Sequence, residues 1–211
     1  MIEQIRRSFS LYSPKDLPPA GRPSAAVLIP LYKRGGQLHI ILTKRSEWVA
    51  NHKGEISFPG GVYDKRDKDL LTTALRESEE EIGLKPRDVE IIGRLDDLVG
   101  RFHVRPYIGS LSSPYPYPWR LRLEEVSAIL DVPVAHLLDQ ANIAKFRRVF
   151  DGQTIETQAF QFGEHVIWGA TARMLGGFLN VITGDGRFSA ASSLPEVPSR
   201  AEFGLTDAAD A

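Results

Sequence analysis

The apolar residues of the N-terminal third fall into two short runs separated by a turn. Residues 24–32, SAAVLIPLY, form an apolar run typical of a buried strand, and Pro30 is expected at its end or at a sheet edge. Residues 37–43, QLHIILT, predict a second strand. Gly35 and Gly36 between the two runs tolerate positive φ angles. The pattern therefore predicts a β-hairpin.

A long helix is predicted in the middle of the chain. It follows an Asp-rich stretch, residues 64–69, in which Asp67 or Asp69 is a suitable N-cap. Gly83 is suited to end the helix, because glycine readily adopts the left-handed conformation of a helix C-terminus. The apolar residues of this segment share one arc, which can pack against a core.

Three glutamates of this helix are crowded on one side. At about 100° per residue, Glu77, Glu80 and Glu81 fall within an arc of ~100°. Like charges at this spacing cost a helix a few tenths of a kcal/mol per pair, which a bound hard cation such as Mg²⁺ would offset. Gly60 and Gly61 upstream have no side chains, so their backbone can approach the acidic arc closely. The alternative is a solvated, glutamate-rich helix face.

The rest of the chain alternates between strand and helix patterns. A short helical turn is predicted over residues 134–138, and a second helix completes residues 165–183 after HVIW. Further strands are predicted at residues 88–95, 102–110 (interrupted by Pro106), 126–133, 145–150 and 154–162. Mixed strands with one central and one C-terminal helix predict an α/β (α+β) fold in which helices sandwich a mixed sheet.

The domain organisation follows from local composition. Residues 1–21 are interpreted as an N-terminal arm, made of a short amphipathic helix and a Pro-rich linker. Residues 22–184 are expected to form one domain. Residues 185–211 are polar, rich in Ser, Pro and Ala and poor in large hydrophobic residues, so we expect a flexible tail.

Composition narrows the class of protein. The 211 residues are 42% hydrophobic and 25% charged, as in an ordinary globular protein. The net charge of −1 argues against broad electrostatic binding to nucleic acid or to an anionic membrane. No run approaches the ~18 apolar residues of a membrane span. The chain has no cysteine, which excludes disulfides, thiol nucleophiles and Cys-ligated zinc, and fits a cytoplasmic location.

The helix and its flanks resemble the Nudix hydrolase family. Residues 76–84, RESEEEIGL, match the second half of the Nudix signature, with Ser78 in its apolar position. The first half differs, because Gly61 precedes this motif by one position more than the signature allows. The position of the first signature glutamate is then occupied by Asp67 or by Lys68, depending on where the extra residue is placed.

A narrower resemblance is to Nudix enzymes that cleave coenzyme A. Residues 41–46 (ILTKRS), Gly54 and residues 58–61 (FPGG) are similar to the segment that precedes the signature in those enzymes. Residues 167–169, IWG, also have a counterpart there. An arginine expected in the spacer falls at Ala50 in this chain, which favours a different substrate.

The resemblance implies hydrolysis of a nucleoside diphosphate linked to another group, with Mg²⁺ or Mn²⁺ as cofactor. It points first to coenzyme A or its thioesters, with 3′,5′-ADP and 4′-phosphopantetheine as products. The alternatives are ADP-ribose, a dinucleotide or a modified nucleoside triphosphate as substrate, and a nucleotide-binding protein without turnover. A small-molecule nucleotide is thus the expected partner, and a homodimer is left open.

The resemblance also implies a set of metal ligands. Glu77, Glu80 and Glu81 are expected to bind the divalent cation, with the carbonyl oxygen of Gly60 or Gly61 as a further ligand.

The catalytic residues implied by the resemblance are Arg76, Glu77, Glu80 and Glu125. Arg76 is expected to orient a glutamate of the signature through a charge pair. The general base is expected to be Glu77, Glu80 or an acid from a later loop, for which Glu125 is the candidate and Glu124 the alternative. Glu125 is equally consistent with a surface position before a strand.

A basic loop precedes the glycine pair. Lys44, Arg45, His52 and Lys53 are expected to contact the phosphates of the substrate, including the 3′-phosphate of coenzyme A, and Arg45 is the strongest candidate. The alternative is an ordinary solvated loop.

Aromatic residues offer weaker signals. Tyr115, Tyr117 and Trp119 either stack on the adenine or the pantetheine of the substrate or pack against the core. His103 lies in an apolar strand pattern and is expected to be structural.

Overall fold

The computed structural model describes residues 2–48, 53–112, 116–150 and 153–188, without the side chains of residues 146–150 and 153–156. Its main sheet has eight strands in the order β3-β2-β1-β7-β5, with β4 paired to β1, β6 to β7 and β8 to β2. The strands are β1 (Ser24–Arg34), β2 (Gln37–Arg45), β3 (Ile56–Ser57), β4 (Gly60–Val62), β5 (Val89–Arg94), β6 (Leu98–Val99), β7 (His103–Leu111) and β8 (Val126–Pro133).

A second, three-stranded sheet has the order β11-β10-β9. Its strands are β9 (Ile143–Phe150), β10 (Gln153–Phe162) and β11 (His165–Ile167). The helices are α1 (Ile2–Leu11), α2 (Leu70–Ile82), α3 (Val134–Leu138) and α4 (Gly169–Thr183), with short 3₁₀ turns η1 (Pro86–Asp88) and η2 (Gln140–Asn142).

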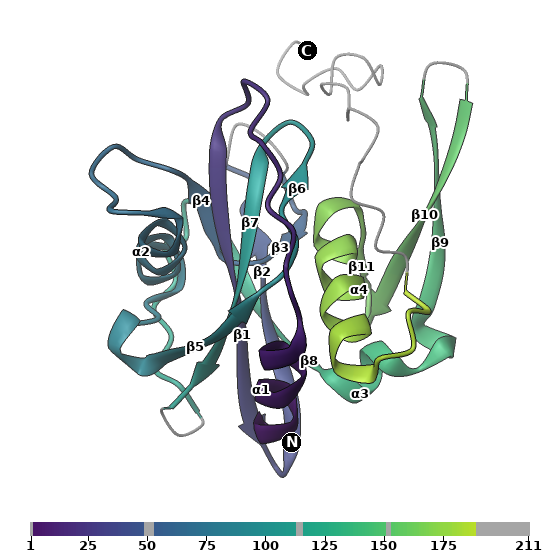
Figure 1. The fold of residues 1–211 in the computed structure, drawn as a ribbon, viewed down its shortest axis with the longest axis horizontal. Helices are drawn as coiled ribbons and strands as arrows, with labels where there is room; N and C mark the ends of the chain where they lie inside the picture. Colours follow the sequence, from purple (N-terminus) through teal and green to yellow (C-terminus); the bar gives the residue numbers. More distant parts are fainter. Residues whose placement is uncertain (1, 49–52, 113–115, 151–152, 189–211) are drawn as a thin grey trace.

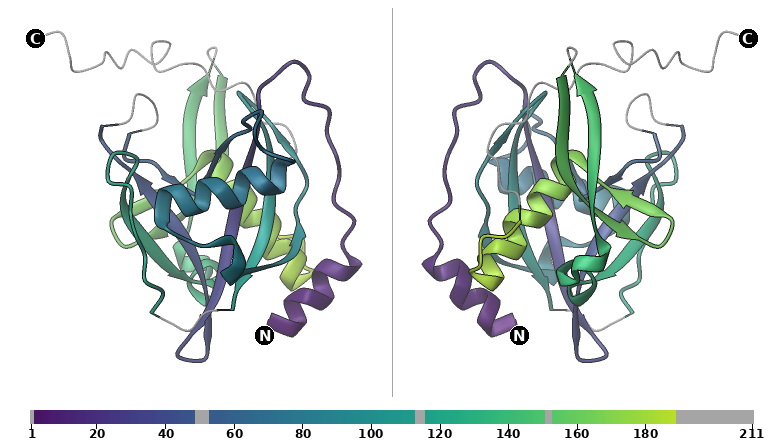
Figure 2. Two further views of the ribbon diagram at one scale, coloured as in Figure 1. Left: turned by 90° about the vertical axis from the view of Figure 1, so that its left-hand side faces the viewer. Right: turned by 90° about the vertical axis from the view of Figure 1, so that its right-hand side faces the viewer.

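The helices form layers on the two sides of the main sheet. α2 lies on one face, while α1 and α4 lie on the other, with the second sheet beyond α4 (Figures 1 and 2). β1 and β7 are parallel, whereas β1 and β2 are antiparallel, so the sheet is mixed. The predicted α/β/α sandwich with a mixed sheet is therefore confirmed.

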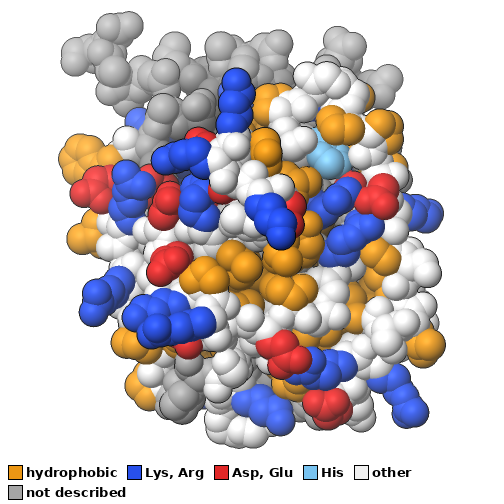
Figure 3. All heavy atoms as spheres, turned by 60° about the vertical axis from the view of Figure 1, so that its left-hand side comes forward, with side chains coloured by type: hydrophobic (Ala, Val, Ile, Leu, Met, Phe, Trp, Pro, Cys, Tyr) orange, Lys and Arg blue, Asp and Glu red, His pale blue; other side chains and the backbone are white. Residues whose placement is uncertain are grey.

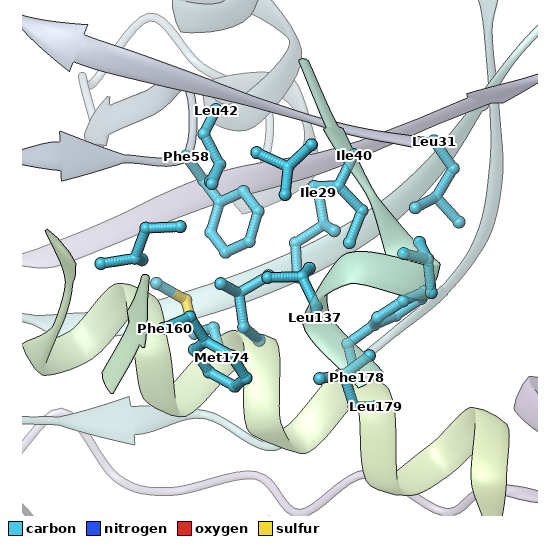
Figure 4. Close-up of a cluster of buried hydrophobic side chains, with 14 of the residues drawn as sticks. Ile29, Leu31, Ile40, Leu42, Phe58, Leu137, Phe160, Met174, Phe178 and Leu179 are labelled. Carbon is cyan, nitrogen blue, oxygen red and sulfur yellow. The ribbon is translucent and has the colours of Figure 1, made fainter. Parts of the chain in front are cut away.

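Strand alternation distributes the apolar residues of β1 between two cores. Ile29 and Leu31 point toward α4 and join a cluster with Phe178, which Figure 4 shows in close-up. Ala26 and Leu28 point the other way and belong to the cluster beneath α2. Successive side chains of a strand face opposite sides, so one apolar run supplies both cores. This explains why residues 24–32 are almost uniformly apolar.

The local signals of the sequence are largely confirmed. Gly35 and Gly36 turn the β1–β2 hairpin with φ angles of 57° and 80°. Asp69 is the N-cap of α2 and accepts a hydrogen bond from the backbone N–H of Thr72. Gly83 ends α2 in the left-handed region, with φ 72°. The β9–β10 hairpin also forms, although its turn lies outside the described residues.

The expectations for the two strand prolines, that Pro30 ends its strand or lies at an edge and that Pro106 interrupts its strand, were wrong. Pro30 lies inside β1, a central strand. Its nitrogen faces the gap between the residues paired with β4, which end at Val27, and those paired with β2, which begin at Leu31. Pro106 likewise does not interrupt β7, because β5 ends its pairing at Tyr107. Neither position requires the N–H that proline lacks.

The N-terminal arm packs against the body of the protein. Ile5 and Phe9 of α1 are buried, and the Phe9 ring stacks on Phe178 of α4 at a centroid distance of 6.2 Å. At the other end, Phe188 is buried and its backbone is held by the side chain of Asn180. Residues beyond 188 are outside the described part, so the division into arm, domain and tail stays a prediction.

None of the described helices combines the length and the apolar character that a membrane span needs.

Candidate active site

The glycine pair forms the edge of the site. Gly60 and Gly61 lie in β4, which pairs with β1 and contacts α2. Gly60 has φ 151°, and a Cβ there would lie 2.3 Å from the carbonyl oxygen of Ala26. A Cβ on Gly61 would lie 2.5 Å from the carboxyl carbon of Glu77. Any side chain would therefore displace either the strand or the glutamate, which explains the two glycines.

Glu81 is the buried member of the acidic arc. Only 3% of its surface is exposed, and its Oε2 accepts a hydrogen bond of 3.1 Å from the backbone N–H of Gly60. Burial raises the pKa of Glu81 to about 8, although the Gly60 hydrogen bond and the charge of Arg45 act in the opposite direction. A nearby cation would stabilise the charged form of this buried carboxylate.

Glu77 and Glu80 lie nearer to solvent and share one arginine. Arg76 Nη1 lies 2.9 Å from Glu77 Oε1 and 3.2 Å from Glu80 Oε2. The Glu77 side chain is 17% exposed and that of Glu80 is 46% exposed. Burial raises the pKa of Glu77 above its usual range, and Arg76 opposes that effect. Arg76 thus holds both carboxylates on its own side of α2.

Asp67 anchors this arginine. Its carboxylate accepts hydrogen bonds from Arg76 Nε at 2.8 Å and Nη2 at 3.0 Å, and a third from the Thr73 hydroxyl at 2.8 Å. Asp67 is buried, and the hydrogen bonds from Arg76 hold the pKa of its carboxyl well below the usual range. Of the two candidates for the first glutamate position of the signature, Asp67 is therefore the one in contact with the signature arginine.

Glu125 lies close to the acidic arc. Its charge raises the pKa values of both Glu77 and Glu81, and its side chain is 33% exposed. Arg122 Nη1 holds Glu125 Oε1 at 2.9 Å. The sequence patterns do not single out Arg122, although the i,i+3 spacing of opposite charges is visible in them. Glu124 is exposed.

Among the described residues of the basic loop, Arg45 acts electrostatically on the acidic arc. Its charge acts on Glu81, and its buried Nε has no hydrogen-bond partner in the described part of the chain. The backbone N–H of the next residue, Ser46, donates to the carbonyl oxygen of Glu125 at 2.8 Å, which draws the two loops together. Lys44 is half-buried in β2 and Lys53 is exposed.

Neither Lys44 nor Lys53 forms an ion pair with the α2 carboxylates among the described residues. His52 and Ala50 lie outside the described residues, so their predicted roles stay open.

The other aromatic and histidine candidates have structural contacts. Tyr117 is buried against Trp119, and its hydroxyl donates to Asp88 at 2.8 Å. His103 is buried, and its Nε2 lies 3.0 Å from Asp97. Tyr117 and His103 are thus part of the protein's internal packing, while Tyr115 lies outside the described residues.

The donor set fits a hard divalent cation. It offers carboxylate and backbone carbonyl oxygens without sulfur or imidazole, the ligands that Mg²⁺ and Mn²⁺ prefer. In the described residues no three acidic or histidine side chains converge closely enough to hold a metal as they stand. The reason is the pairing of Glu77 and Glu80 with Arg76, whereas Glu81 turns toward Gly60. Rotation of these side chains would be needed to bring the oxygens together.

Comparisons with known proteins agree with this arrangement. Residues 22–141 match the model of the NUDIX domain. Proteins of Salmonella paratyphi B and Salmonella newport, both described as the uncharacterized Nudix hydrolase NudL, are 36% identical over 153 residues, which is 72% of this chain and 78% of theirs.

Solved structures show more distant likeness. A C. elegans Ap4A hydrolase has a TM-score of 0.45 at 18% identity, covering 55% of this chain and 83% of its own. The NUDIX domain of Shewanella oneidensis NrtR, solved with ADP ribose, has a TM-score of 0.44 at 22% identity, covering 63% of this chain and 84% of its own. The family match spans more than half of the chain and includes the acidic helix, so this protein belongs to the Nudix family and is a hydrolase that acts on pyrophosphate bonds.

Proposed function

We propose that this hydrolase cleaves the diphosphate of coenzyme A or of its thioesters, giving 3′,5′-ADP and 4′-phosphopantetheine. The chemistry rests on one observation: Glu77, Glu81 and the backbone of Gly60 and Gly61 meet where α2 packs against β4. The choice of substrate rests on the resemblance of residues 41–46 and 58–61 to enzymes that cleave coenzyme A.

Glu77, Glu80 and Glu81, with a carbonyl oxygen of Gly60 or Gly61, would hold the Mg²⁺ or Mn²⁺ that Nudix enzymes generally use. When bound, such cations neutralise the diphosphate and lower the pKa of water. Glu81 is well suited to this role, because among the described residues its buried carboxylate has only the Gly60 N–H to offset desolvation by hydrogen bonding.

The protein's own residues would then order the reactants. Arg76, fixed by Asp67, sets the positions of the Glu77 and Glu80 carboxylates. A carboxylate that accepts a proton from the attacking water must lie within about 3 Å of it, and Glu77, Glu80 and Glu125 are the candidates. Glu125 faces the arc from another loop and is restrained by Arg122.

The basic residues before β3 would contact the anionic substrate. Within the described part of the chain, the buried Nε of Arg45 has no hydrogen-bond partner, and the charge of Arg45 acts on Glu81, so a substrate phosphate could satisfy that donor. Lys44, His52 and Lys53 are assigned to the same phosphates. We further place the enzyme in the cytoplasm as a monomer or a homodimer.

A substrate panel with Mg²⁺ or Mn²⁺ and chromatographic identification of products tests this proposal. Coenzyme A and its thioesters should be hydrolysed faster than ADP-ribose, dinucleotides and modified nucleoside triphosphates. Strong turnover of ADP-ribose without turnover of coenzyme A would reject the substrate. That alternative is favoured by Ala50, where related enzymes carry an arginine.

A pair of variants tests the site. Glu80→Gln should lower kcat by at least ~10²-fold if this carboxylate holds a cation that stabilises the transition state. Glu164→Gln is the matched control, because Glu164 is 84% exposed in the turn before β11. Equal rates for the Glu80 variant and the parent would reject the metal site.

A further inference from the structure

A surface pocket of about 340 Å³ lies at the C-terminal end of α2, next to the acidic arc. Its wall includes Glu80 and Gly83 from the helix end, Lys85 just after it, and Arg120 and Arg122 from the loop before β8. The pocket therefore shares Glu80 with the proposed metal site. Figure 3 shows the face toward which α2 lies, where basic and acidic side chains are interspersed across the upper half.

The loop that carries the two arginines is held firmly against the helix end. The backbone N–H of Arg120 donates to the carbonyl oxygen of Ile82, and that of Arg122 donates to the carbonyl oxygen of Glu81, both at 3.0 Å. The close approach is possible because residue 83 is glycine, where a Cβ would lie 2.8 Å from that of Arg120. The two guanidinium side chains thus start from a fixed backbone on the rim of the pocket.

Two of the three basic side chains that line the pocket are not in ion pairs among the described residues. Within the described part of the chain, the side chains of Lys85 and Arg120 form no ion pair, although two glutamates line the same pocket. Arg122 pairs with Glu125 at 2.9 Å, which links the rim to the acidic arc. Arginine forks and a lysine around one cavity are suited to a phosphate, which accepts several charge-assisted hydrogen bonds.

The C-terminal end of α2 repels an anion less strongly than an uncapped helix C-terminus would. The C-terminus of a helix carries a partial negative charge on its unpaired carbonyl oxygens. Here the carbonyl oxygens of Glu81 and Ile82 accept hydrogen bonds from the arginine loop, and that of Glu79 accepts one from Gly83. With these groups satisfied, the side chains dominate the local field. A cation bound to Glu80 would also remove one of the two negative charges in the pocket.

We propose that this pocket binds a phosphate monoester carried by the nucleoside half of the substrate, while the diphosphate lies at the carboxylates of α2. The inference rests on the proposed function, since it takes the acidic arc as the place of cleavage. A ribose bears its 3′-phosphate and its 5′-diphosphate on the same ring, so their binding sites must be neighbours. The pocket and the acidic arc meet this condition through Glu80.

The phosphate monoester and the diphosphate would thus be bound by different basic residues, the first at the pocket and the second at the basic loop before β3. Lys85 and Arg120 would select the monoester, whereas Arg45 would serve the diphosphate beside Glu81. Substrates with and without the monoester should therefore differ in KM and not in kcat.

A double variant, Lys85→Ala with Arg120→Ala, tests this assignment. We expect KM for coenzyme A to rise ~10-fold or more, as for the loss of charge-assisted hydrogen bonds. KM for 3′-dephospho-coenzyme A and kcat for both substrates should stay within about twofold. Arg87→Ala is the matched control, because Arg87 is 76% exposed and lies outside the pocket.

Calorimetric binding makes the test independent of turnover. Adenosine 3′,5′-bisphosphate should bind the parent protein more tightly than adenosine 5′-monophosphate, and the double variant should lose ~10-fold of that preference. Loss of the preference without any hydrolysis of coenzyme A would support the pocket and reject the proposed substrate. Hydrolysis of coenzyme A with unchanged discrimination in the double variant would reject the pocket alone. A selective loss in Lys53→Ala would also reject it, by placing the monoester on the basic loop.

Discussion

Replacing Asp67 by Asn should destabilise the protein and impair catalysis together. Asp67 is 5% exposed and accepts two hydrogen bonds from Arg76, one from the Thr73 hydroxyl and one from the backbone N–H of Asp64. The substitution leaves the Arg76 guanidinium without its buried counter-charge. Breaking a buried pair costs about 3–5 kcal/mol, and because Arg76 is 24% exposed, water can replace part of the loss. We therefore expect a decrease of about 2–4 kcal/mol in unfolding free energy at pH 7.

The pH dependence of this loss follows from the pKa of Asp67. Arg76 depresses that pKa in the folded protein, so the carboxylate stabilises the fold above the pKa of the unfolded chain, near 4. This contribution is lost progressively as the pH falls below that value. The difference between parent and Asp67→Asn should thus be full at pH 7 and begin to close below about pH 4.

Urea denaturation followed by circular dichroism measures the unfolding free energy. The kcat for the best substrate reports whether Glu77 and Glu80 are still positioned by Arg76. Asp64→Asn is the matched control, since the described ion pair of Asp64 is with the exposed Arg66 and its replacement should leave the midpoint nearly unchanged. Equal midpoints for the parent and Asp67→Asn would refute the anchoring role of Asp67.

Three further results are expected. Gly61→Ala should lower kcat by about 10²-fold with little loss of stability, because the added Cβ would displace the Glu77 carboxylate. A variant as active as the parent would contradict the need for glycine at position 61. In EDTA, Glu81→Gln should be more stable than the parent by a few kcal/mol at pH 8 and equal to it near pH 4.5. The pKa of Glu81 is raised to about 8 in the folded parent protein, so the unfolding free energy of the parent falls by ~1.4 kcal/mol per pH unit as the pH rises toward 8. Thermal unfolding at both pH values checks the sign. Phe9→Ala should cost about 3 kcal/mol in urea denaturation, whereas Leu11→Ala, at an 81% exposed position, should cost almost nothing, and similar losses for the two would contradict the packing of α1.

Long-range contacts decided the parts of the site that local patterns left open. Asp67 and Lys68 were both compatible with the signature until the fold brought Asp67 against Arg76. Arg45 and Glu81 are far apart in sequence. The charge of Arg45 acts on Glu81 because β2 belongs to the main sheet and α2 covers one face of that sheet. Arg122 and the pocket it lines depend on the path of an irregular loop, for which the sequence has no periodic signal.

The sequence by itself determined the longer strands, the hairpin turn and the acidic helix, because these depend on side-chain periodicity, on the φ angles that glycine tolerates and on capping within a few residues. It also determined that Glu77, Glu80 and Glu81 share one side of α2, since helix geometry is fixed. Tertiary structure alone decided which of them is buried: Glu81 faces β4 and has a pKa raised to about 8, while Glu80 stays at the surface. The reason is that burial depends on what packs against a helix, and that partner comes from distant segments of the chain.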